Sequence, residues 1–92
     1  MSMKTTRFDV ADYLDSEEAV QEYFRQVMED GDADEIIRAL GHIARARGMM
    51  QLAKDTGLAR ESLYRALSDG AKPRFDTILR VTKALGLKLT AA

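Results

Sequence analysis

Five polar side chains lie within six residues of one another, and their types suit hydrogen bonding to nucleic-acid bases. Arg60 and Arg65 can each donate two hydrogen bonds to O6 and N7 of guanine, and Glu61 can accept one from N4 of cytosine. Ser62 adds a hydroxyl group that can bond a phosphate or a base edge, and Tyr64 lies between them in the sequence. This segment has the chemistry of a surface that reads DNA from the major groove.

Three further residues extend this candidate DNA-binding set. Lys72 and Arg74 lie in a short basic loop that follows the polar segment, where they can contact phosphates. The loop leads into a predicted helix at Phe75, whose first backbone N–H groups can add to a phosphate contact. Gln51, upstream of the polar segment, completes the set.

The apolar residues around this segment predict how it is held. Leu52 and Ala53 face inward on a first short helix, and Gly57 supplies the tight turn that a helix–helix corner needs. Leu63 and Leu67 then anchor a second helix at i, i+4 spacing. Helix–glycine–helix corners also occur in ordinary helical proteins, so only the corner together with its polar outer face and basic loop indicates a DNA-binding helix-turn-helix.

Hydrophobic periodicity and capping residues predict an all-α fold, a compact helical bundle with this helix-turn-helix inside it. We expect an acidic N-terminal helical extension over residues 1–32 and a DNA-binding domain over 33–92, together in one compact unit. A short helical turn over 9–14 and an extended tail or strand over 87–90 are also predicted. The helices expected are 16–30, 32 or 34 to 47, 49–56, 60–68 and 75–85, the last with a core face of Phe75, Ile78, Leu79, Thr82 and Leu85.

The formal net charge of −1 conceals a strong asymmetry. Residues 1–40 carry eleven acidic and four basic side chains, whereas residues 41–92 carry ten basic and four acidic ones. Such a division is typical of a chain whose basic half meets an anionic partner, although both halves can also simply solvate helix surfaces.

Several function classes find no support in the sequence. The chain has no cysteine and a single histidine, His42, and no catalytic set can be assembled, so we expect no enzyme activity. The acidic residues around Asp32 lack the spacing of a calcium loop, and we expect no metal and no cofactor. The first residues contain no apolar signal-peptide core and no run is long enough to span a membrane, which favours a cytoplasmic protein.

A resemblance to a known family adds to this interpretation. The segment LGHIARARGMMQLAKDTGLARESLYRALSDGAKPRFDTILRVTKALGLKL resembles the Cro/repressor-type (XRE-like) helix-turn-helix. It is more closely similar to the HigA-like antidote, or antitoxin, proteins of bacterial addiction modules. The head FDVADYLDSEEAVQEYFRQVMEDGDADEIIRALGHIARARGM also resembles the head of that subgroup. Ala59 departs from the serine or threonine usual at its position, and Met49 from a phosphate-contacting glutamine.

The resemblance implies a five-helix, dimeric DNA-binding antitoxin that neutralises a RelE/ParE-type toxin and represses its own operon from a palindromic operator. Its acidic head then becomes the candidate toxin-binding element, with Glu17, Tyr23 and Phe24 as candidate contacts, although the two aromatic residues also suit the core. Two alternatives stay open. One is a plain transcriptional regulator without a toxin, and the other is a protein-interaction module whose main role is to occlude a basic toxin.

Overall fold

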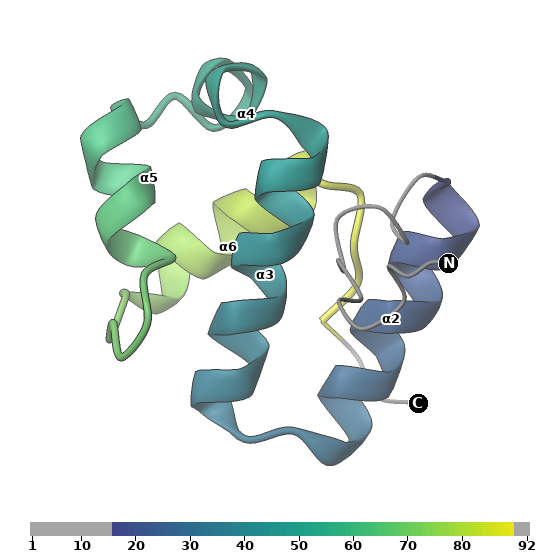
Figure 1. The fold of residues 1–92 in the computed structure, drawn as a ribbon. Helices are drawn as coiled ribbons and strands as arrows, with labels where there is room; N and C mark the ends of the chain where they lie inside the picture. Colours follow the sequence, from purple (N-terminus) through teal and green to yellow (C-terminus); the bar gives the residue numbers. More distant parts are fainter. Residues whose placement is uncertain (1–15, 90–92) are drawn as a thin grey trace, which may run out of the picture.

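A computed structural model of the chain describes residues 16–89, which form five α-helices and no strand (Figure 1). The all-α prediction is therefore confirmed, while the helical turn expected over 9–14 lies outside the described residues. The helices are α2 (Glu17–Asp30), α3 (Ala33–Arg47), α4 (Met49–Thr56), α5 (Arg60–Ala66) and α6 (Phe75–Ala84).

The first two helices begin at side-chain caps that the sequence encodes. The Ser16 hydroxyl accepts a hydrogen bond from the backbone N–H of Ala19 at 3.1 Å, at the start of α2. At the start of α3, Asp32 and Glu35 form a capping box with two bonds of 2.9 Å. The structure thus selects Asp32 over Asp34 as the cap, because Glu35 stands three residues after it.

One hydrophobic core joins all five helices. Val20 and Phe24 of α2 pack in the same buried cluster as side chains from α3 to α6. The predicted boundary after residue 32 falls between α2 and α3, and the core crosses it. The remaining members of the cluster are Leu40, Ile43, Ala44, Leu52, Leu63, Leu67, Val81, Leu85 and Leu87.

The helices α2 and α5 lie on opposite sides of the molecule, with α3 and α6 between them (Figure 1). Helix α2 packs on α3, and α4 packs on α3, α5 and α6. A surface on α5 and a surface on α2 can therefore be occupied at the same time by different partners. No helix within residues 16–89 is long and apolar enough to cross a membrane.

Two expectations at the C-terminal half need correction. Phe75 was expected in the core, but it is 69% exposed at the first position of α6, and Val81 fills the core instead. Helix α5 ends at Ala66, two residues before the predicted Ser68. Of the strand or extended tail expected over 87–90, residues 87–89 form no strand, which leaves the tail, and Leu87 packs into the core.

Candidate nucleic-acid interface

The corner between α4 and α5 is a three-residue turn fixed by backbone and side-chain hydrogen bonds. Gly57 takes the left-handed conformation at φ 76° that the sequence predicted. Next to it, the buried hydroxyl of Thr56 donates to the carbonyl of Leu52 at 2.9 Å and accepts from the backbone N–H of Leu58 at 3.2 Å. Thr56 was missed in the sequence, although a threonine directly before a turn glycine is a usable signal.

Helix α5 is short and is held by the residues beneath it. Leu63 and Leu67 are buried at 0% and 5% exposure, and Leu52 of α4 is buried against them. Gly41 of α3 allows a close approach, since a Cβ there would lie 3.1 Å from the Leu67 carbonyl oxygen. These contacts fix one face of α5 and leave the other to solvent.

The exposed face of α5 carries the five side chains that the sequence singled out. All five are exposed, and Tyr64 retains 47% of its surface. Within residues 16–89, none of these side chains makes a hydrogen bond or an ion pair. Their donors and acceptors are therefore free to bind a ligand. They are Arg60, Glu61, Ser62, Tyr64 and Arg65.

The N-terminus of α5 has no side-chain cap. Ala59 stands at the N-cap position in an extended conformation, and no side chain accepts from the first backbone N–H groups. This confirms the missing hydroxyl that the sequence indicated at Ala59. The first turn of α5 accordingly leaves backbone donors available beside Arg60.

The basic loop and α5 form the two walls of a hollow of about 500 Å³. Ser62 and Arg65 line it from α5, and Lys72 and Arg74 line it from the loop. The structure therefore brings these four predicted residues together around one concave surface. Gln51 does not line it, and its amide instead donates to Asp55 on α4 at 2.9 Å.

The two loop cations have weak intramolecular partners. Lys72 Nζ lies 3.6 Å from Asp34 of α3, and Arg74 Nε lies 3.8 Å from Asp76. Their side chains are 83% and 88% exposed, so solvent screens both ion pairs. A phosphate can therefore replace either carboxylate at small cost.

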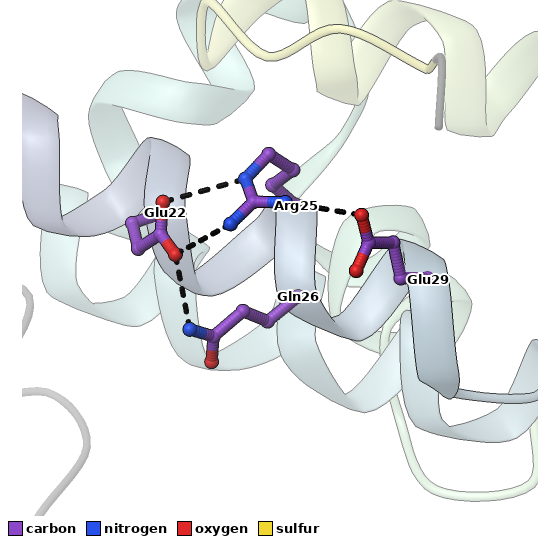
Figure 2. Close-up of polar contacts among 4 residues, drawn as sticks. All are labelled: Glu22, Arg25, Gln26 and Glu29. Atoms are coloured by element: carbon purple, nitrogen blue, oxygen red, sulfur yellow. Dashed lines mark hydrogen bonds and ion pairs between the residues drawn. The ribbon is translucent and has the colours of Figure 1, made fainter. Parts of the chain in front are cut away.

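On the exposed side of α2, the one arginine is paired with two glutamates of its own helix (Figure 2). The guanidinium of Arg25 donates to Glu22 at 2.7 and 3.3 Å and to Glu29 at 3.1 Å. Gln26 donates a further hydrogen bond to Glu22 at 3.0 Å. These donors, Arg25 first, lower the pKa of the Glu22 carboxyl, and the Glu22 contact raises the pKa of Arg25.

The three residues expected to contact a toxin differ in their surroundings. Glu17 is exposed at the start of α2, and it lines a hollow of about 410 Å³ with Glu18 and Lys88. Tyr23 is half-buried, and this burial raises the pKa of its hydroxyl. Phe24 is only 2% exposed, so its ring belongs to the core and does not offer a partner a docking side chain.

No metal centre is found among the residues that the structure describes. Within 16–89, no group of three or more histidine, cysteine, aspartate or glutamate side chains could hold an ion. The imidazole of His42 lies on α3 with its Nδ1 atom 3.1 Å from the guanidinium of Arg45. The acidic start of α3 acts as a helix cap.

Comparisons with known proteins identify the family. A family model described as "Probable addiction module antidote protein" matches residues 4–92, nearly the whole chain. The chain therefore belongs to this family of probable addiction module antidote proteins. It is also 46% identical over 88 residues to a Haemophilus influenzae protein described as "Uncharacterized protein", covering 96% of this chain and 91% of that protein. No solved structure matches the chain significantly.

Proposed function

We propose that this chain is the antitoxin of a toxin–antitoxin pair and that it binds the operator of its own operon through a helix-turn-helix made of α4 and α5. The observation that carries the DNA-binding part is the outer face of α5, where five polar side chains are exposed and unpaired within residues 16–89. Membership of the antidote family supports the antitoxin part.

In the proposed complex, α5 enters the major groove and its arginines meet base edges. Arg60 and Arg65 are suited to guanine, and Glu61 to cytosine. Lys72 and Arg74 contact the phosphate backbone from the far wall of the hollow, and Gln51 contacts a phosphate next to α4. Phosphate contacts set the register of the protein on DNA, and the α5 side chains supply the sequence preference.

The toxin-binding part of the proposal uses the other side of the molecule. Glu17, Glu18 and the half-buried ring of Tyr23 lie on α2, away from α5 (Figure 1). A RelE/ParE-type toxin with a basic active surface would be attracted by these carboxylates, because complementary fields raise association rates. The chain would bind both the DNA and the toxin in the cytoplasm, and it would act by binding without catalysis.

A titration of DNA from upstream of the chain's own reading frame tests the DNA-binding part. We expect Arg60→Ala to lose about 1–3 kcal/mol of specific binding and to relax one base position. Lys72→Ala should lower the affinity for all DNA sequences alike. It should also flatten the slope of log K against log salt by about one unit. Arg25→Ala, an exposed arginine change on α2, is the matched control and should bind DNA like the wild type.

Wild-type affinity in both Arg60→Ala and Lys72→Ala would contradict the assignment of α5 as the DNA-reading helix. The two alternative functions are distinguished by a binding assay with the protein encoded by the neighbouring reading frame. Binding of that product by a chain that ignores DNA would favour the toxin-occluding module, which the acidic side of α2 supports. DNA binding without any protein partner would favour the plain regulator.

A further inference from the structure

The exposed face of α5 holds one side chain to which the proposed complex has given no role. Tyr64 retains 47% of its surface, and it is one of three large apolar residues that are exposed within 16–89. Its side chain makes no hydrogen bond, ion pair or ring contact with any described residue. A single exposed ring is common on protein surfaces, so the groups around Tyr64 decide whether it has a function.

The neighbours of Tyr64 on α5 are two residues assigned to base edges. Arg60 and Glu61 precede it by four and three residues, and such spacings make side chains neighbours on the surface of a helix. All three side chains line one hollow of about 530 Å³, together with Ala59. The ring of Tyr64 therefore belongs to the hollow at the N-terminal end of α5, and this is the end of a recognition helix that contacts base edges.

The residues assigned to phosphates lie around a different hollow. Lys72 and Arg74 line that hollow together with Ser62 and Arg65, and Tyr64 does not contribute to it. The ring thus lies with the base-contacting side chains, where an apolar group of the DNA must cover it. The edges of the four bases present one apolar group in the major groove, the C5-methyl group of thymine.

We propose that Tyr64 packs its ring against the methyl group of a thymine, next to the bases that Arg60 and Glu61 contact. Such packing removes two apolar groups from water at once. The proposal rests on the proposed function and deepens it, because it names a base that the hydrogen-bonding side chains of α5 do not specify. On a palindromic operator bound by two copies of the chain, this thymine recurs in each half-site.

Replacing thymine by uracil in the operator tests the contact, because uracil lacks the methyl group and keeps the hydrogen-bonding atoms of thymine. The probe is DNA from upstream of the chain's own reading frame, in which each thymine is replaced in turn. We expect the full-length chain to lose about fourfold in affinity at one thymine of each half-site, the effect of exposing about one buried methyl group.

Variants of Tyr64 identify the side chain responsible for this loss. Tyr64→Ala should bind the thymine and uracil forms of that position equally well, whereas Tyr64→Phe keeps the ring and should keep the fourfold difference. Met50→Ala is the matched control, since Met50 is also an exposed apolar residue, at 64%, but lies on α4. It should keep the fourfold difference. Circular dichroism of each variant verifies the fold.

Two results would overturn the proposal: a wild-type chain that binds the operator but is insensitive to uracil at every thymine, or a Tyr64→Ala chain that keeps the full uracil effect. A Tyr64→Phe chain that loses affinity for all sequences alike would also contradict it, because the hydroxyl group would then contact a phosphate. A wild-type chain that does not bind the DNA at all contradicts operator binding itself, so the two failures are distinguishable.

Discussion

Helices α2 and α5 bury one face in the same core but differ in whether their exposed arginines are paired. Helix α2 has fourteen residues, a serine cap and an arginine that bonds two glutamates of its own helix. Helix α5 has seven residues, no side-chain cap and, within residues 16–89, no ion pair for either arginine. Arg25 thus supports its own helix α2, whereas Arg60 and Arg65 of α5 have no ion-pair partner within residues 16–89.

The difference also shows what keeps each helix folded. A seven-residue helix is too short to be stable alone, so α5 depends on the burial of Leu63 and the turn at Gly57. Helix α2 has local support from its cap and ion pairs. Yet α2 also places Phe24 in the shared core, so the acidic side is part of the fold and not an appendage.

The largest effect should come from removing that shared anchor. We expect Phe24→Ala to lower the free energy of unfolding by about 3–5 kcal/mol, because it leaves a cavity where the ring is 2% exposed. Urea denaturation measures the change, and Phe75→Ala is the matched control because its ring is 69% exposed. Similar losses in the two variants would show that α2 does not contribute to the core as described.

The next effect concerns the turn that orients α5. Gly57→Ala should destabilise the chain by about 1–2 kcal/mol, since a Cβ disfavours the left-handed conformation at φ 76°. Apart from its two chain neighbours, no residue within 16–89 has an atom within 4 Å of the added Cβ, so the cost is one of backbone conformation and not of crowding. Gly57→Asn should cost less, because asparagine tolerates this region. Equal losses for alanine and asparagine would contradict this cause.

A smaller effect concerns the ion pair between Lys72 of the basic loop and Asp34 of α3. Asp34→Asn removes the carboxylate 3.6 Å from Lys72 Nζ, which frees that cation for a phosphate. Because exposed pairs contribute about 0.2–1 kcal/mol, we expect operator affinity at low salt to rise by less than about fivefold. Asp30→Asn is the control, since Asp30 is exposed on α2 without an ion pair to any described residue. Equal gains in both variants would indicate a general charge effect.

The smallest effect is a pH dependence on α2. The pKa of Glu22 is lowered in the folded chain, so its ion pair stabilises the protein above the ordinary glutamate pKa and is lost as the pH falls through the lowered value. Glu22→Gln should melt slightly below wild type at pH 7, and the difference should narrow below about pH 4. A difference that stays constant with pH would contradict this assignment.

The helix boundaries could be predicted because the chain marks them locally. The capping pair Asp32 and Glu35 and the glycines at 48 and 57 set the ends of α3 and α4 within the sequence itself. The polar face of α5 was also predictable, because Leu63 and Leu67 fix which side is buried. The spacing of apolar residues along a helix therefore predicts its buried face directly.

Features that depend on packing between distant segments could not be predicted. Phe75 fits the apolar period of α6 but is exposed at its first position, whereas Val81 is buried. Phe24 would be apolar either as a core residue or as a toxin contact, so only its packing shows that it belongs to the core. The pairing of Lys72 with Asp34 joins residues 38 positions apart, which no local pattern encodes.

A crosswise binding measurement tests the central claim that the two sides serve different partners. Arg60→Ala and the double variant Glu17→Lys with Glu18→Lys are each titrated with operator DNA and with the product of the neighbouring reading frame. We predict that Arg60→Ala loses about tenfold or more in DNA affinity and keeps toxin affinity. The double variant should lose toxin affinity and keep DNA affinity. The account is contradicted if Arg60→Ala binds DNA like wild type, or if each variant loses both partners equally.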